Sequence, residues 1–180
     1  MLNFLKISTK LKKNFKYGVF GNTLIGIFLR GFGDTIQQNI EIKSNQNQGQ
    51  KFDLTRTKNI SLTGVVIGPL NYYWYKYLDT KYPTKTPRII IKKILLDQIY
   101  GATFFTFLFI VIVCLLDGKT IRESLSEFVE KFPFIYLVDW LLWPPSQALN
   151  FYLVPKEFRV IFVNLTLVCW NIFLSYVKYN

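Results

Sequence analysis

Five apolar stretches alternate with polar connections along the chain, and their lengths predict helices that cross a membrane. A helix rises about 1.5 Å per residue, so about 20 residues are needed to span roughly 30 Å of hydrocarbon. Ile94–Leu116 and Phe134–Val154 reach this length, Ile60–Leu78 nearly does, and Val160–Val177 is slightly short but uncharged. Gly18–Gly33 is the weakest of the five because it contains an arginine. The pattern predicts an all-α, polytopic membrane bundle with four to five hydrophobic helices.

A shorter amphipathic helix is predicted between the third and fourth stretches. Thr120 and Glu123 have the spacing of a capping box, in which each side chain bonds the backbone of the other residue. Apolar residues then recur at three- and four-residue intervals, opposite a face rich in glutamate: Ile121, Leu125, Phe128 and Phe132. We expect this helix to lie along the membrane interface.

Residues 1–16 form a basic, acid-free segment whose apolar residues share one face if the segment is helical. Its lysines are Lys6, Lys10, Lys12, Lys13 and Lys16. This composition is typical of mitochondrial targeting segments, and it also suits a helix that lies on a lipid surface. We therefore divide the chain into this N-terminal segment and a single helical membrane domain over residues 17–180.

The composition favours a membrane protein and excludes several other classes. Hydrophobic residues make up 51% of the chain and charged residues 18%, and the mean hydropathy is +0.22, which excludes a disordered chain or a disulfide scaffold. Histidine is absent, so Ser-His-Asp units and the common zinc sites are excluded. Cys114 and Cys169 lack metal-ligand spacing, and the chain has no phosphate-binding glycine motif. We expect no enzyme activity, no metal and no cofactor.

Much of the net charge of +11 lies in two segments that we expect on the same side of the membrane. If the first two apolar stretches both cross, the N-terminal lysines share a side with a second basic group. That group comprises Lys81, Lys85, Arg88, Lys92 and Lys93. Basic residues favour the inner side of a membrane, which in a mitochondrion is the matrix. The N-terminal lysines together with Lys81, Lys85 and Arg88 are a candidate contact face for a ribosomal RNA or protein.

Ionisable residues near or inside the apolar stretches need partners, because a bare charge in hydrocarbon is costly. Three acids have a basic residue one helical turn earlier, which predicts local ion pairs. These pairs are Arg30–Asp34, Lys76–Asp79 and Lys93–Asp97. Asp139 lacks such a neighbour, so it needs water or a residue from another helix. Two interpretations remain open for it: the wall of an aqueous cavity or pore, or an interfacial acid near the start of its helix.

Polar amides and glycines inside the apolar stretches are candidate interhelical or pore-lining positions. The amides are Gln98, Gln147, Asn150, Asn164 and Asn171, and the carboxylate of Asp97 joins them. Hydrogen bonds between helices are the commoner role of such amides in a membrane. Gly64 and Gly68 form a GxxxG pattern, which favours close helix packing.

Blocks of residues from Gly33 to the C-terminus closely resemble the Mpv17 / PMP22 family of mitochondrial and peroxisomal membrane proteins. The C-terminal block reads Trp143-Pro144, Gln147, Asn150-Phe151, Val154-Pro155, Arg159, Asn164, Trp170-Asn171 and Leu174-Ser175, in family order and spacing. Earlier blocks are Gly33-Asp34 with Gln38, Gly68-Pro69 with Trp74-Tyr75 and Leu78-Asp79, and Lys93 with Asp97-Gln98. The family often has a proline shortly after the Asp-Gln pair, whereas residues 99–103 here have none.

The resemblance implies function as well as fold. Asp139-Trp140 and the ending Leu174-Ser175-Tyr176 with Lys178 are most similar to the type-two Mpv17-like subgroup. That similarity implies an inner mitochondrial membrane protein that supports mitochondrial ribosome assembly and translation from the matrix face, with the peroxisomal membrane as the alternative location. Channel-like relatives imply the alternative function, a path for small solutes lined by Asp139 and the amides. The implied partners are the lipid bilayer, the mitochondrial ribosome and a second copy of the chain.

Overall fold

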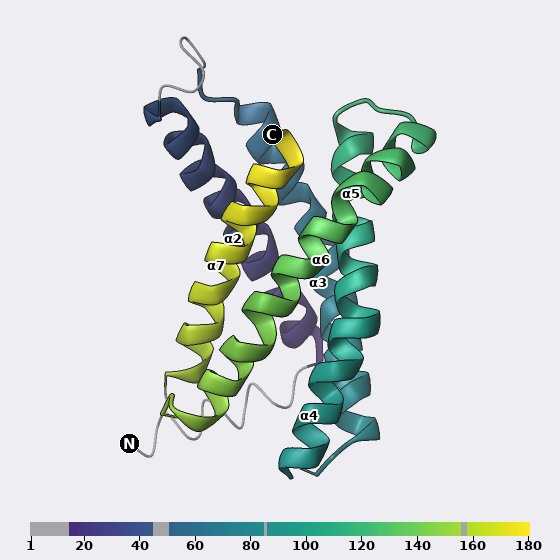
Figure 1. The fold of residues 1–180 in the computed structure, drawn as a ribbon, viewed down its shortest axis with the longest axis vertical. Coiled ribbons are helices and arrows are strands. Elements are labelled where there is room, and N and C mark those ends of the chain that lie inside the picture. Colours follow the sequence, from purple (N-terminus) through teal and green to yellow (C-terminus); the bar gives the residue numbers. More distant parts are fainter. Residues whose placement is uncertain (1–14, 45–50, 85, 156–157) are drawn as a thin grey trace.

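The computed structural model describes residues 15–44, 51–84, 86–155 and 158–180, and every regular element within these ranges is a helix (Figure 1). In chain order they are α2 (Phe15–Lys43), α3 (Leu54–Lys81), α4 (Pro87–Leu96), the π-helix η1 (Asp97–Ala102), α5 (Thr103–Leu116), α6 (Ile121–Tyr152) and α7 (Arg159–Tyr179). The predicted all-α bundle is confirmed. Each of the five apolar stretches coincides largely with one of these helices or, for the third stretch, with α4, η1 and α5 in succession.

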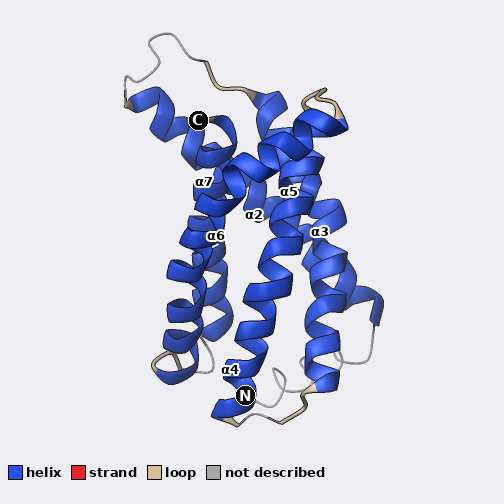
Figure 2. Cartoon of the chain, turned by 45° about the vertical axis from the view of Figure 1, so that its right-hand side comes forward, coloured by secondary structure: helices blue, strands red, loops and turns tan. Residues whose placement is uncertain are grey.

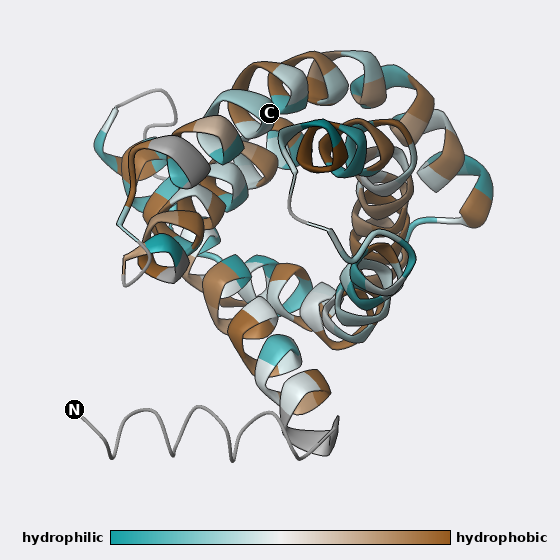
Figure 3. Cartoon of the chain, turned by 90° about the horizontal axis from the view of Figure 1, so that it is seen from below, coloured by the Kyte–Doolittle hydropathy of each residue, from teal (hydrophilic) through white to brown (hydrophobic). Residues whose placement is uncertain are grey.

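The described helices close into a ring. Because α4, η1 and α5 follow one another without a break, they act as one rod beside α2, α3, α6 and α7. α2 contacts α3 and α7, α5 contacts α3 and α6, and α6 contacts α7. Figure 2 shows the rods side by side, and Figure 3 shows them around a common centre. Each rod therefore has a neighbour on both sides, and the first and last described helices complete the circle.

The two ends of this ring carry different parts of the chain, and we name them the α3–α4 end and the C-terminal end. The α3–α4 end also holds the start of α2, because Gly18 lies against Tyr72 near the end of α3. The C-terminal end holds the end of α2, the start of α3, the α5–α6 turn and the end of α7 (Figure 1). The start of α2 therefore lies toward the α3–α4 end, and the predicted membrane side of the N-terminal lysines stays a prediction.

Glycines allow α2 and α3 to approach each other closely. A Cβ atom on Gly64 would lie 2.5 Å from the Ile27 backbone nitrogen, and one on Gly68 would lie 2.7 Å from the Thr23 Cα. Any side chain at these positions would collide with the α2 backbone. The close-packing role predicted for the GxxxG pattern is confirmed.

Two segments are long and apolar enough to cross a membrane by length and composition: Pro87–Leu116 and Ile161–Tyr179. The first contains η1, six residues of π-helix that begin at Asp97. This element includes residues 99–102, part of the stretch in which the family resemblance implies a proline and the sequence has none. Short π-helical turns occur frequently at functional sites.

The predicted interfacial helix and the fourth apolar stretch form one element, the 32-residue α6. It begins at the predicted capping box: the Thr120 backbone N–H donates to Glu123 Oε2 at 2.7 Å, and the Glu123 backbone N–H donates to Thr120 Oγ1 at 3.3 Å. Pro133, Pro144 and Pro145 lie inside α6 and do not end it. The amphipathic stretch is thus the first part of a long rod.

An apolar core fills the ring toward its C-terminal end. Its buried side chains are Ile60 and Ile67 from α3; Phe109, Ile110, Val113 and Cys114 from α5; Ile135 from α6; and Trp170, Leu174 and Val177 from α7. The family-motif residue Trp143 packs edge-to-face on Trp170, with ring centroids 6.3 Å apart. Since this core draws on four rods, it holds the ring together and occupies its interior.

Candidate functional site

A partly buried polar cluster joins α3, η1 and α6. Asp97, the first residue of η1, accepts hydrogen bonds from Trp74 Nε1 at 2.7 Å and from the Tyr75 hydroxyl at 2.8 Å. Gln98 and Asp139 lie beside it and are 2% and 5% exposed. We call these five residues the membrane polar cluster. It unites three of the polar positions that the sequence singles out.

Two oxygen atoms of the membrane polar cluster, Gln98 Oε1 and Asp139 Oδ2, are buried without a hydrogen-bond partner among the described residues. Asn150 Oδ1 and Arg30 Nε share this condition. An unsatisfied buried polar atom costs roughly 1–3 kcal/mol, so these atoms are where water or a polar ligand would bind. Asp139 is 5% exposed and lies inside α6, so its side chain faces the interior of the ring.

The other predicted amides lie on α6 and α7. Asn171 is buried against α2, where Gly33 makes room for it: a Cβ on Gly33 would lie 2.6 Å from the Asn171 Cβ. Asn171 is therefore an interhelical contact residue. Gln147 and Asn164 are half-buried.

Two of the local ion pairs expected from helical spacing, Arg30–Asp34 and Lys93–Asp97, are wrong, because these acids bind partners on other elements. Asp34 pairs with Arg56 of α3 at 2.9 Å and not with Arg30, whose Nη1 donates to its own helix backbone. Asp79 pairs with Lys93 of α4 at 2.7 Å. Asp97 is held by the two α3 aromatic residues rather than by Lys93. Contacts across the ring thus replace contacts along one helix.

Arg56 links three helices at the C-terminal end. Its Nε donates to Asp34 Oδ1 at 2.9 Å, and its Nη1 and Nη2 donate to the two Glu41 carboxylate oxygens at 2.7 and 3.0 Å. Nη2 also donates to Ser175 Oγ of α7 at 2.8 Å. Burial alone raises the pKa of Glu41, but the hydrogen bonds from Arg56 and Gln37 outweigh it, so the pKa lies below its usual value. The acid is therefore ionised at neutral pH.

Glu127 is the centre of a second group of ion pairs, which joins the α5–α6 turn to α6 and α7. It accepts hydrogen bonds from Lys119 Nζ at 2.7 Å, Lys178 Nζ at 2.9 Å and Cys114 Sγ at 3.0 Å. Lys131 Nζ lies 3.5 Å away. Burial raises the pKa of Glu127, but the bonds from Lys119 and Lys178 more than compensate and lower it to about 2. Cys114 is thus buried and donates a hydrogen bond to Glu127. Cys169, the other cysteine, is exposed.

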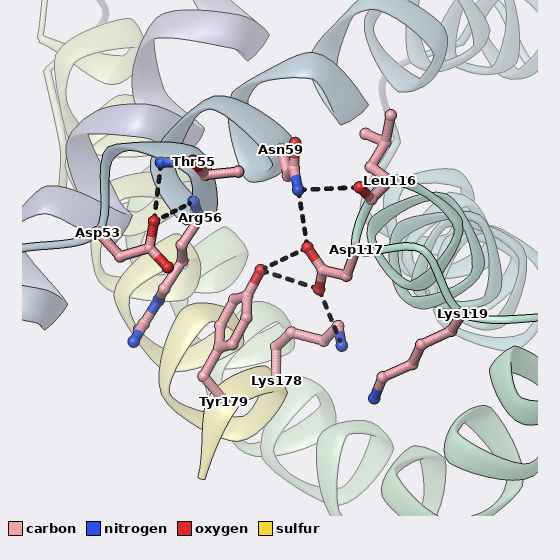
Figure 4. Close-up of a pocket in the computed structure, with 9 residues that line it drawn as sticks. All are labelled: Asp53, Thr55, Arg56, Asn59, Leu116, Asp117, Lys119, Lys178 and Tyr179. Atoms are coloured by element: carbon pink, nitrogen blue, oxygen red, sulfur yellow. Dashed lines mark hydrogen bonds and ion pairs between the residues drawn. The ribbon is translucent and has the colours of Figure 1, made fainter.

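An open pocket of about 490 Å³ lies between these two groups (Figure 4). Asp117 on its wall accepts hydrogen bonds from Asn59 Nδ2 at 2.8 Å and from the Tyr179 hydroxyl at 3.1 Å, and Lys178 Nζ lies 3.6 Å from it. The Arg56 guanidinium stacks on the Tyr179 ring at 4.2 Å. The three basic side chains on the walls are each paired with a carboxylate. The positive and negative charges on the pocket walls therefore balance one another, and the pocket is a contact between helices.

We call these charged residues together the ion-pair network: Asp34, Glu41, Arg56, Asp117, Lys119, Glu127 and Lys178. Sequence reasoning missed most of it, because Arg56 and Glu127 stand outside the apolar stretches and look like exposed charges. The signals that could have found it were the family resemblance at Asp34, Ser175 and Lys178. The network ties together α2, α3, the α5–α6 turn, α6 and α7.

Part of the predicted basic face lies outside the described ranges: Lys6, Lys10, Lys12, Lys13 and Lys85. Lys16 belongs to α2, but its side chain is not described. Lys81 and Arg88 are exposed at the α3–α4 end.

The family-motif residues near the α6–α7 connection hold its geometry. Arg159 Nε donates to the Val154 carbonyl oxygen at 3.2 Å, across the turn that contains Pro155.

Two further family-motif residues lie elsewhere or are not described. Pro69 lies inside α3 and does not end it. The Phe151 side chain is outside the described part of the chain.

The chemistry available to the membrane polar cluster is hydrogen bonding and charge. Within the described residues, no group of three or more His, Cys, Asp or Glu side chains is placed to hold a metal ion. Asp139 can carry a negative charge or a proton, Gln98 can donate and accept, and Asp97 is fixed by two donors. The arrangement suits a polar solute or a file of water molecules.

Comparison with known proteins identifies relatives over most of the chain. Residues 114–175 match the Mpv17 / PMP22 family. The chain is 32% identical to PXMP2/4 family protein 2 of Dictyostelium discoideum over 155 residues, 85% of this chain and 80% of that one. It is 35% identical to mitochondrial inner membrane protein Mpv17 of Homo sapiens over 149 residues (82% and 83%), and 28% identical to peroxisomal membrane protein 2 of Bos taurus over 161 residues (88% and 82%). No solved structure matches the chain significantly.

Proposed function

The chain belongs to the Mpv17 / PMP22 family of membrane proteins, and on that premise we propose that its helix ring forms a narrow, gated path for small polar solutes. Its relatives are named for the mitochondrial inner membrane and for the peroxisomal membrane. We place this protein in the inner mitochondrial membrane because residues 1–16 are basic and acid-free. The peroxisomal membrane is the alternative.

The observation that carries the proposal is the pair of unpartnered oxygen atoms on Gln98 and Asp139. In a membrane, every polar group has to be satisfied within the protein or by water, and a carboxylate is the most costly group to leave bare. The two side chains come from η1 and α6, which lie on neighbouring rods and face the same interior. Water that reaches them would also solvate a small solute, as pore-lining polar groups do in channels.

Two features support a closed state at the C-terminal end. The apolar core occupies the ring interior beyond the membrane polar cluster, and an apolar constriction blocks conduction by excluding water. The ion-pair network then ties α7 to α2 and α3 through Arg56 and Ser175. Opening would require α7 to move relative to these helices, which gives the path its gate.

Asp139→Asn tests the proposal in purified protein reconstituted in liposomes. We expect flux of small solutes through the wild-type protein and reduced preference for cations over anions in the variant, because the negative charge of the path is lost. Asp79→Asn is the matched control, since Asp79 is largely exposed and pairs with Lys93 at the α3–α4 end. Absence of flux through the wild-type protein, or identical ion preference in wild type and Asp139→Asn, would refute the path.

A second candidate function, support of mitochondrial ribosome assembly and translation, is favoured by the basic residues at the α3–α4 end. Lys81 and Arg88 are exposed there, and the lysine-rich residues 1–16 lie at the N-terminal side of α2 in the sequence. Contacts to ribosomal RNA through these groups would weaken steeply with salt. Salt-graded sedimentation of gently solubilised mitochondria tests this role. Co-migration with a ribosomal subunit that is lost as salt rises would support it, and migration independent of ribosomes at low salt would contradict it.

A further inference from the structure

An aromatic groove runs along the outside of the ring between α3 and the η1–α5 rod. It encloses about 570 Å³ and is lined by Leu70, Tyr73, Trp74, Tyr77, Tyr100, Gly101, Phe104 and Phe105. A Cβ on Gly101 would collide with Asp97 and approach Trp74 Nε1. The absence of a side chain at Gly101 therefore leaves space at the bottom of the groove, next to η1. The membrane polar cluster lies directly behind this wall, through Trp74.

The groove has the depth of one membrane leaflet. On α3, Leu70, Trp74, Tyr77 and Lys81 are spaced by four, three and four residues, so they form one stripe along the helix. The stripe covers twelve residues from Leu70 to Lys81, and the eleven helical steps between them span about 16 Å. Half of a roughly 30 Å hydrocarbon layer is about 15 Å. With Lys81 at the interface, Leu70 therefore lies near the middle of the bilayer.

Positive charge gathers at the outer mouth of the groove. Lys81 Nζ donates to the Tyr77 hydroxyl at 2.7 Å, which joins the lining directly to an ammonium group. Lys92 Nζ lies 4.7 Å from the ring centroid of Tyr82, the residue after Lys81. From residue 76 to residue 93 the sequence has six basic residues and one acid: Lys76, Lys81, Lys85, Arg88, Lys92 and Lys93 against Asp79. The mouth therefore attracts an anion.

We propose that this groove binds an anionic phospholipid of the surrounding leaflet. An acyl chain lies along the aromatic lining toward Leu70, and the phosphate lies at the mouth near Lys81 and Lys92. The tyrosine hydroxyls between them suit the level of the glycerol and ester groups, where amphipathic aromatic side chains collect. Basic pockets beside membrane helices recognise anionic headgroups in this way. The inference stands independently of solute conduction, because no step of it requires an open path.

The test uses the full chain, purified in mild detergent and stripped of lipid, with dioleoyl-phosphatidylglycerol and dioleoyl-phosphatidylcholine as probes. These lipids share their chains and differ in headgroup charge. Native mass spectrometry should show preferential retention of phosphatidylglycerol, and thermal unfolding should shift upward with that lipid. Lys81→Gln and Lys92→Gln should each weaken its binding about fivefold. Lys58→Gln, an exposed lysine at the opposite end of α3, is the matched control and should bind as the wild type.

A second variant tests the acyl part of the site. Leu70→Trp fills the inner end of the groove and should reduce binding of the dioleoyl lipid, whereas Leu165→Trp, on the exposed face of α7, should not. Equal retention of the two lipids by the wild-type protein would overturn the proposal. So would wild-type binding by the double variant Lys81→Gln/Lys92→Gln, or competition by glycerol phosphate as strong as that of the intact lipid.

Discussion

Replacing Arg56 with glutamine removes the cation that holds α2, α3 and α7 together at the C-terminal end. The guanidinium makes four hydrogen bonds, one to Asp34, two to Glu41 and one to Ser175. Asp34 is fully buried and Glu41 is 6% exposed, so both carboxylates would stay in the protein without their opposite charge. Breaking a buried ion pair typically costs about 3–5 kcal/mol. Neutral donors remain for both acids, so we expect a loss near the lower limit, about 3 kcal/mol.

The assay is equilibrium unfolding of the purified protein in detergent, with Lys58→Gln as a control that removes an exposed charge from the same helix. The pH dependence gives a second readout. The folded pKa of Glu41 lies below its usual value, so the stability it contributes is present above the unfolded pKa of about 4.3 and is lost as pH falls through the folded pKa. The difference between wild type and Arg56→Gln should therefore shrink below about pH 4. A loss at pH 7 no larger than that of Lys58→Gln would refute the reasoning.

Two further substitutions test the ring at other places. Glu127→Gln should lower the unfolding free energy by about 3 kcal/mol at pH 7, because the folded pKa of about 2 lies well below the ordinary 4.5. That advantage is present above the unfolded pKa and should vanish as pH falls from about 4.5 toward 2, and a constant difference over this range would contradict it. Gly64→Ala should destabilise by about 1–3 kcal/mol because its Cβ meets the α2 backbone. Gly21→Ala, with open space around it, should not destabilise, and equal effects in thermal unfolding would argue against the close contact.

Features that depend on neighbours along the chain could be predicted from the sequence. The lengths of the apolar stretches place the helices, because hydrocarbon thickness and helix rise together fix how many residues a span needs. The capping box needs only Thr120 and Glu123, three positions apart. The close approach at Gly64 and Gly68 follows from the absence of side chains on one helix face. None of these three predictions requires knowing which helices become neighbours in the ring.

The ion pairs could not be predicted, because they depend on which helices become neighbours. Helical spacing offered Asp34 a partner four residues away, but the partner is Arg56, 22 residues along the chain. Lys93 likewise binds Asp79, at a separation of 14 residues. For Asp139 the sequence showed the need for another helix without identifying η1. The π-helix itself has no known local signature in residues 97–102, and we find none here.

The closing contact between α2 and α7 sets an order on how the protein can be made. Ser175 Oγ donates to Asp34 Oδ1 at 2.6 Å across 141 residues of chain, and Asn180 Nδ2 donates to Glu41 across 139. α2 and α3 can pair as soon as both have been synthesised, but the flank of α2 that carries Asp34 has no α7 to cover it until residues 159–180 have been synthesised. During that interval the face of α2 that will contact α7 is uncovered, and it carries the acidic residues Asp34 and Glu41. A change in the last turns of α7 would therefore act on the contact that closes the ring last among the described helices.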